Sequence, residues 1–175
     1  MFYRRGCAGF MLVFACGGFL VPTPAQDNLP DGSQARDMIT PQTQQAIDAG
    51  LAYLANQQHA DSSFGTGGQV GNVAISSLGG LALMAGGNQP GRGRYGKNVT
   101  NAVRYVLSQE DPNTPGFLIN RRAAFHGPMY GHGFATLFLA EAHGMVNQPE
   151  LKKQLREVLG RAVKLIINTQ NREVG

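Results

Sequence analysis

The sequence predicts an all-α fold in which helices with one polar face alternate with helices that are apolar on every side. Apolar residues recur at helical spacing in several segments. Two intervening segments of helical length carry almost no polar residue, which is typical of buried helices. A glutamine near the end of each polar-faced segment recurs along the chain and indicates a repeat. This order suggests two concentric layers of helices.

The first 25 residues are predicted to be a signal peptide that is removed from the mature protein. A basic start at Arg4 and Arg5 precedes an apolar stretch over residues 8–21. An uncleaved membrane anchor, a lipoprotein cleavage box ending at Cys16 and twin-arginine export are the alternatives. Export predicts a secreted or periplasmic protein, in contact with a membrane only through an uncleaved or lipidated leader.

Removal of the signal peptide limits the chemistry of the remaining chain. The only cysteines of the 175 residues, Cys7 and Cys16, are lost with it, which excludes disulfides, thiolate catalysis and cysteine-bound zinc. The formal charge falls from +4 to +2, because Arg4 and Arg5 are lost and no acid is. The remaining charge gives no case for a nucleic-acid partner.

Residues 26–39 are polar and are predicted to be a flexible leader, and structure is expected from Thr40 onward. Thr40 is an N-cap followed by proline, and the first helix extends to Gln57–Gln58. A glycine-rich loop follows, and Asn72 caps a second, apolar helix over residues 73–85.

Three further helices complete the predicted domain over residues 40–175. The third covers residues 98–109, with Asn98 as its N-cap, and the same residue begins a possible glycosylation sequon. The fourth covers residues 131–143 and is again mostly apolar, whereas the fifth, over residues 149–170, is amphipathic.

The repeat is clearest when the amphipathic helices are aligned on Gln57, Gln109 and Gln170, which are 52 and 61 residues apart. In the first two copies an aromatic residue beside a glycine follows the glutamine, namely Phe64 and Phe117. In the third copy the sequence ends before such a residue would appear, so we expect the sequence to be truncated within a repeat.

The segments Tyr-Leu-Ala-Asn-Gln-Gln at 53–58 and Tyr-Val-Leu-Ser-Gln at 105–109, each followed by its phenylalanine and glycine, resemble the squalene cyclase and prenyltransferase repeat family. Members of that family form an α/α toroid, an inner ring of helices surrounded by an outer ring. The resemblance implies an incomplete toroid of about two and a half repeats. It also implies that the glutamines and aromatic residues tie adjacent repeats together.

The resemblance transfers no catalytic residue to this chain. The acidic Asp-x-Asp-Asp motif of the hopene cyclases is missing, since Asp61 stands alone before two serines. The zinc ligands of the protein prenyltransferases include a cysteine, which the mature chain lacks. Whether the protein is an enzyme is left open, and no cofactor or metal is expected.

Four residues are candidates for a ligand-binding site: His126, Tyr130, His132 and Glu141. The first three lie in a glycine-rich loop that is predicted to lead into the fourth helix, where a cavity lining is expected. The alternatives are that Tyr130 and His132 hydrogen-bond the loop and cap the helix, or that His126 and His132 bind a metal. Glu141 is either a buried general acid or a residue near the helix end that contacts water, Arg121 or Arg122.

Two other motifs are interpreted as structural. Residues 91–96 match the dinucleotide-binding glycine pattern, but a helix and not a strand precedes them. The main cluster of basic residues consists of Arg92, Arg94 and Lys97, and it is interpreted as a solvated loop.

Two functions remain. The first is an exported toroid that binds an isoprenoid or another apolar small molecule in its cavity. The alternative is a non-catalytic secreted scaffold that binds a protein or a polysaccharide. In either case an incomplete solenoid exposes an apolar edge, which predicts self-association.

Overall fold

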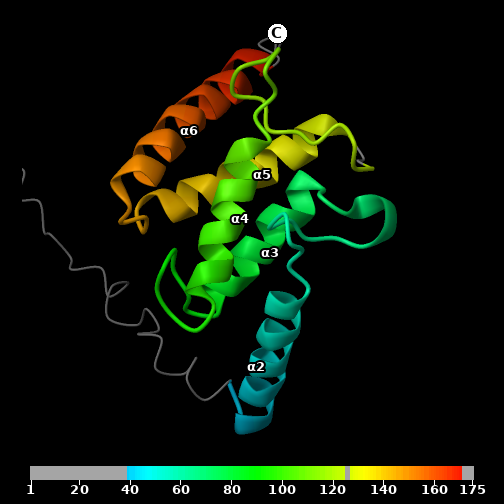
Figure 1. Cartoon of the computed structure of the whole chain (residues 1–175), viewed down its shortest axis with the longest axis vertical. Coiled ribbons are helices and arrows are strands. Elements are labelled where there is room, and N and C mark those ends of the chain that lie inside the picture. Colours follow the sequence, from blue (N-terminus) through cyan, green and yellow to red (C-terminus); the bar gives the residue numbers. More distant parts are fainter. Residues whose placement is uncertain (1–38, 125–126, 171–175) are drawn as a thin grey trace, which may run out of the picture. The chain divides into compact units, whose positions relative to one another are not determined.

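A computed structural model describes residues 39–124 and 127–170, and no strand forms within these two ranges. The predicted signal peptide, the leader up to residue 38 and the candidate His126 lie outside the described residues. The described chain contains five α-helices and one short 3-10 turn (Figure 1): α2 (Pro41–Asn56), η1 (Gly67–Gln69), α3 (Val73–Ala85), α4 (Gly96–Ser108), α5 (Pro128–His143) and α6 (Pro149–Thr169). The predicted all-α class is confirmed.

Helix α2 begins where the sequence predicts. The side chain of Thr40 accepts a hydrogen bond of 3.2 Å from the backbone nitrogen of Thr43, and Pro41 occupies the first helical position. Residues 41–50 are all exposed, and only Leu51, Leu54 and Ala55 pack against the core. Among the described residues, the contacts that anchor the helix are therefore at its C-terminal end.

Helix α3 also has its predicted bounds. The Asn72 side chain accepts hydrogen bonds from the backbone nitrogens of Ala74 and Ile75, at 2.9 and 3.2 Å. The Asn72 amide nitrogen donates to the carbonyl oxygen of Ala124, 2.7 Å away. The cap of α3 is thus also a contact with the segment that leads to α5.

The prediction that Asn98 caps the third helix is wrong. Helix α4 starts two residues earlier, at Gly96, so that Asn98 lies within its first turn. Its amide nitrogen donates to the carbonyl oxygen of Ala55 and to the side-chain oxygen of Gln58, at 3.1 and 3.0 Å. The nitrogen that a glycosylation sequon would present is therefore engaged in the contact between α4 and the end of α2.

The predicted start of the fourth helix is also wrong. Helix α5 begins at Pro128, three residues before the predicted Gly131, so that Tyr130 is helical and not part of a loop. Proline at the first helical position provides the φ that a helix requires. Gly127 before it has a φ of 73°, which is not helical, so the helix cannot start earlier. Helix α6 follows after a short connection and ends at Thr169, one residue short of its predicted bound.

Helices α3 and α5 pack closely against each other, α4 contacts both, and α6 packs along α5 (Figure 1). The close approach of α3 and α5 depends on Gly80, where an added Cβ would lie 2.4 Å from the Phe138 ring. The core between these helices consists mainly of Leu83 of α3, Val99, Val103 and Val106 of α4, Phe138 and Leu139 of α5, and Leu155 of α6.

The apolar helices are not buried on every side, contrary to the prediction. In α3, Leu78 is 44% exposed, and in α5, Tyr130 and Leu137 are 74% and 49% exposed. Each of these helices buries one face against its neighbours, but no element of the described chain covers the other face. Within residues 39–124 and 127–170, an apolar face along two helices is therefore left uncovered, and it is called the open face below.

The three aligned glutamines occupy equivalent places. Gln57, Gln109 and Gln170 are the C-cap residues of α2, α4 and α6. The repeat in the sequence is thus a repeat of helix ends.

In the described part of the chain, no helix is both long and apolar enough to cross a membrane.

Candidate ligand-binding site

The candidate residues do not converge on one site. Tyr130 is exposed in the first turn of α5, whereas His132, two residues later, is completely buried on the other side of the helix. Glu141 is exposed and shares a face with Tyr130, but eleven helical residues separate the two by about 16 Å. The structure gives these three residues different surroundings and therefore different chemistry.

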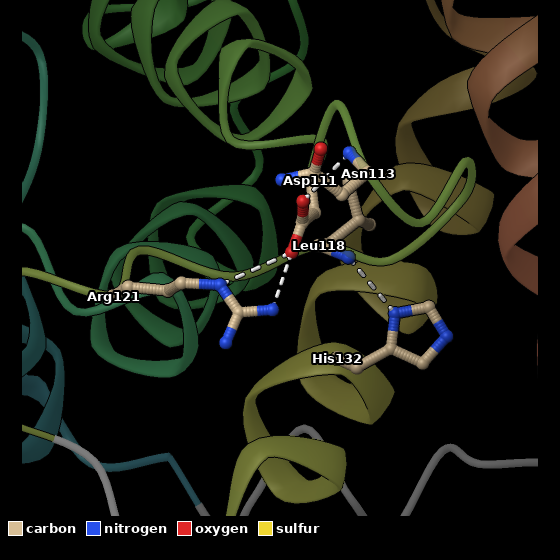
Figure 2. Close-up of polar contacts among 5 residues, drawn as sticks. All are labelled: Asp111, Asn113, Leu118, Arg121 and His132. Atoms are coloured by element: carbon tan, nitrogen blue, oxygen red, sulfur yellow. Dashed lines mark hydrogen bonds and ion pairs between the residues drawn. The ribbon is translucent and has the colours of Figure 1, made fainter.

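His132 connects α5 to two other segments. The backbone N–H of Leu118 donates to Nδ1 over 3.3 Å, as Figure 2 shows, and Nε2 lies 3.3 Å from the carbonyl oxygen of Ala162 in α6. Because Nδ1 accepts, the proton of the neutral ring must be on Nε2, which donates to Ala162. The edge of the ring also meets Phe117, with centroids 5.5 Å apart.

Burial lowers the pKa of His132 below its ordinary value of 6.5, and the hydrogen bond to the Ala162 carbonyl opposes this shift in part. The bond from Leu118 adds to the effect of burial, because a protonated Nδ1 cannot accept it. His132 is thus a neutral group that holds the loop before α5 in position.

Two ion pairs hold the same loop. Arg121 donates to Asp111 through Nε at 3.1 Å and Nη2 at 2.5 Å, and the Asn113 N–H donates to the other carboxylate oxygen (Figure 2). These contacts, first Arg121 and then Asn113, hold the pKa of Asp111 below its ordinary range. Arg121 therefore pairs with Asp111, and not with Glu141 as one alternative had it.

The second pair joins the loop to α6. Arg161 donates to both carboxylate oxygens of Glu110 at 2.7 Å, and the N–H of Gly116 donates to one of them, also at 2.7 Å. The Arg161 contact is the main reason why the pKa of Glu110 is lowered. Gly116 has a φ of 90° and lies so close to the α6 backbone that an added Cβ would be 2.5 Å from the carbonyl carbon of Arg161.

This fixed loop forms one wall of a large cavity, which has a volume of about 570 Å³. Its apolar walls come from α3, from the loop and from α5, and its polar side-chain groups are three amides and the hydroxyl of Tyr130. The lining includes Val73, Ile75, Leu118, Ile119, Tyr130 and Phe134, together with the amide side chains of Gln69, Asn72 and Asn120. Apart from Tyr130, these residues were missed by the sequence analysis, because they come from three separate segments.

The amides of this cavity are tied to the protein. Asn120 donates to the carbonyl oxygen of Gly71 and to the Tyr105 hydroxyl, at 3.1 and 3.2 Å. The Tyr105 hydroxyl itself donates to the same carbonyl over 2.5 Å, and burial raises the pKa of this phenol. These contacts fix the distance between the loop before α3 and the loop before α5, and so fix the width of the cavity.

A second cavity of about 480 Å³ continues along α3. It is lined by the apolar side chains of Tyr53, Leu54, Phe64 and Leu78, among others, and shares Gln69 and Ile75 with the first. Among the described residues that line the two cavities there is no charged side chain. Glu141 borders a smaller cavity of about 320 Å³, together with Leu81, Leu137 and Met145.

The remaining motifs lie away from these cavities. Arg92, Arg94 and Lys97 are exposed in the loop before α4 and at its start, with Arg94 over the ring of Tyr95 at 5.4 Å. The glycine pattern at 91–96 connects α3 to α4, and no strand precedes it. Among the residues the structure describes, no three side chains of the metal-ligating types lie together.

The cavities thus offer an apolar, uncharged lining on the open face of α3 and α5, with neutral amides at one end. Such a lining favours the burial of apolar surface and disfavours an ionised ligand, which would lose its hydration without gaining a partner. Comparisons of the chain with protein-family models, with curated proteins and with solved structures give no match.

Proposed function

We propose that this protein is an exported binding protein for an isoprenoid or another neutral apolar small molecule, which it holds against the open face of α3 and α5. The observation that carries the proposal is the cavity of about 570 Å³ between Ile75, Leu118 and Phe134. Its volume is within the range of small-molecule sites, about 300 to 1,000 Å³.

The chemistry of the lining supports binding without a chemical reaction. The Gln69 amide nitrogen and the Tyr130 hydroxyl can orient a hydroxyl or carbonyl group of the ligand, while the apolar side chains contact its hydrocarbon part. Near these residues the described chain places no carboxylate, histidine nitrogen or hydroxyl pair in the arrangement of a general acid or nucleophile.

The wider architecture is also a proposal. The packing of α3 against α5, with the amphipathic helices α4 and α6 against them, supports an incomplete α/α toroid of the cyclase and prenyltransferase type. The basic and apolar start of the chain supports export through a signal peptide.

Binding can be tested with the neutral fluorescent probe N-phenyl-1-naphthylamine and its displacement by farnesol, an isoprenoid alcohol. We expect the full chain to bind the probe and farnesol to displace it. Phe134→Ala removes a ring from the cavity wall and is expected to weaken binding by about tenfold.

The matched control is Val163→Ala on α6, because Val163 is 41% exposed, close to the 38% of Phe134, but lines neither large cavity. Equal losses in the two variants would mean that the probe binds to exposed apolar surface in general, which contradicts the proposal. Binding of the probe without displacement by farnesol would exclude the isoprenoid class and leave another neutral apolar molecule as the ligand. Absence of probe binding would favour the alternative of a protein- or polysaccharide-binding scaffold.

A further inference from the structure

His132 is a buried titratable side chain that lies one hydrogen bond away from the cavity wall. Its Nδ1 holds the backbone N–H of Leu118, and Leu118, Ile119 and Asn120 form the loop side of the large cavity. Its Nε2 meets the carbonyl oxygen of Ala162. The ring therefore connects the wall of the cavity to α5 and to α6 at once.

These contacts are compatible only with the neutral ring. A second proton on Nδ1 would point at the Leu118 N–H, which is itself a donor, so the bond of 3.3 Å would be replaced by a repulsive contact. The ring is completely buried, so the charge would also be removed from water. Protonation therefore requires that the loop move away from the ring.

No charged neighbour in the described chain compensates for that cost. On the loop, Glu110 pairs with Arg161 and Asp111 pairs with Arg121, and the ring has neither carboxylate as a partner. Helix α3 carries no titratable side chain. The other titratable groups are Tyr130, Glu141 and His143 on α5 itself, Arg122 on the loop, Lys97, Arg104 and Tyr105 on α4, and Glu150, Lys152, Lys153, Arg156, Glu157 and Lys164 on α6.

We propose that His132 is an acid-sensitive latch on the cavity: its neutral ring holds the wall formed by Leu118, Ile119 and Asn120, and protonation releases that wall and with it the ligand. This inference rests on the proposed function for the identity of the ligand. The latch itself does not, because the contacts of the ring are made with Leu118 and Ala162 of the protein itself.

The direction of the pH dependence follows from the pKa of the buried ring. An open loop exposes a ring that takes up its proton near the ordinary value of 6.5, whereas burial holds the pKa of the closed ring below that value. Between the two values the open state binds more protons, so the closed state loses stability as the pH falls. The opening constant rises by up to about tenfold for each pH unit in this window and levels off below it.

The latch can be tested by amide hydrogen exchange on the full chain between about pH 7.5 and pH 5, corrected for the intrinsic pH dependence of exchange. We expect the protection of the Leu118 N–H to fall with the pH. The N–H of Val99 in α4, which donates to the backbone carbonyl oxygen of Tyr95, is the internal control and is expected to keep its protection.

His132→Asn supplies a matched variant, because its side-chain oxygen can accept the Leu118 N–H and the side chain does not titrate. We expect the protection of Leu118 to become independent of pH in this variant. Constant protection of Leu118 in the wild-type protein, or an unchanged pH dependence in His132→Asn, would overturn the latch. If the variant does not fold, nitrogen NMR of the wild-type ring decides: the loss of protection must coincide with the titration of His132, and a mismatch overturns the latch.

Coupling to the ligand is measured by titration with N-phenyl-1-naphthylamine over the same pH range. The wild-type protein is expected to lose affinity as the pH falls, His132→Asn to keep it, and His143→Asn, a half-buried histidine at the far end of α5, to behave like the wild type. An affinity that does not change while Leu118 loses protection would overturn the coupling. Absence of binding at about pH 7.5 would instead overturn the proposed function, while exchange still decides the latch.

Discussion

Two loop residues are held by the same device, in which a side chain of the next helix accepts a hydrogen bond from the loop backbone. The Phe64 N–H donates to Ser76 Oγ of α3 at 3.0 Å, and the Leu118 N–H donates to His132 Nδ1 of α5. Phe64 and Leu118 are 2% and 0% exposed. In the second repeat, the buried position that corresponds to Phe64 is therefore occupied by Leu118 and not by the adjacent Phe117.

The contact between Gly80 and Phe138 gives a prediction at this scale. Gly80→Ala would place a methyl group 2.4 Å from the ring, in a region where the ring has little room to move because it is completely buried. Overpacking costs about 1 to 3 kcal/mol. We expect a lower free energy of unfolding, measured by urea denaturation.

Gly133→Ala is the matched control, since Gly133 is helical in α5 and exposed, and an added Cβ would meet nothing within 4 Å. This variant is expected to gain about 0.5 to 1 kcal/mol from helix propensity. A stabilised Gly80→Ala protein would show that α3 and α5 do not pack as closely as described.

At the scale of the helices, two N-caps of the same kind should differ in their effect on stability. Thr40 caps α2, in which no residue is fully buried, whereas Asn72 caps α3 and also donates to Ala124. Asn72→Ala is expected to lower the free energy of unfolding by about 1 to 2 kcal/mol, and Thr40→Ala by only a few tenths. Thermal denaturation of the two variants measures the difference, and equal losses would mean that α2 is anchored as firmly as α3.

The pair between Glu110 and Arg161 predicts an acid-dependent attachment of the loop to α6. The pKa of Glu110 lies below its ordinary value of 4.5, so its stabilising contribution is present above that value and is lost as the pH falls through the lowered pKa. Arg161 is 42% exposed, and the contribution is therefore about 1 kcal/mol or less.

Between about pH 6 and pH 3 the wild-type protein loses the contribution of this pair to its free energy of unfolding. Glu110→Gln lacks the charged pair, so its free energy of unfolding should fall less over the same range. The control is Glu150→Gln, which changes an exposed carboxylate in the first turn of α6. Chemical denaturation at a series of pH values measures the dependence. An equal fall in the free energy of unfolding below about pH 6 in the wild type and in Glu110→Gln would contradict the prediction.

For the whole molecule, local signals predicted the helices well and the surfaces poorly. Thr40 and Asn72 marked their helix starts because capping depends on residues within one turn. The start of α5 was predicted three residues too late, at Gly131, whereas Pro128 already sets the helical backbone.

The open face of α3 and α5 was not predicted, because an apolar helix has no polar side to indicate where the solvent lies. The periodicity of apolar residues predicts which side chains avoid water, but only the packed structure shows which neighbouring helices cover them. The cavity was missed for a related reason: Ile75, Asn120 and Phe134 are far apart in the sequence and meet only through the packing of the helices.

The exposed apolar surface finally predicts self-association. On α6, Val163 and Ile167 are 41% and 51% exposed and lie one helical turn apart, so they form a continuous apolar strip. Burial of such a strip against a second copy removes apolar surface from water, at about 25 cal/mol for each Å². We expect the sedimentation coefficient of the full chain to rise with protein concentration.

Val163→Glu combined with Ile167→Glu should abolish this dependence, since two charges on the strip would have to be desolvated in the contact. Asn168→Glu together with Thr169→Glu is the matched control, because it adds the same charge at exposed polar positions of the same helix. If the control dissociates the protein to the same extent, net charge and not the strip governs association. If neither double variant changes the sedimentation of an associating wild type, the copies meet elsewhere, and the open face of α3 and α5 becomes the surface to substitute next.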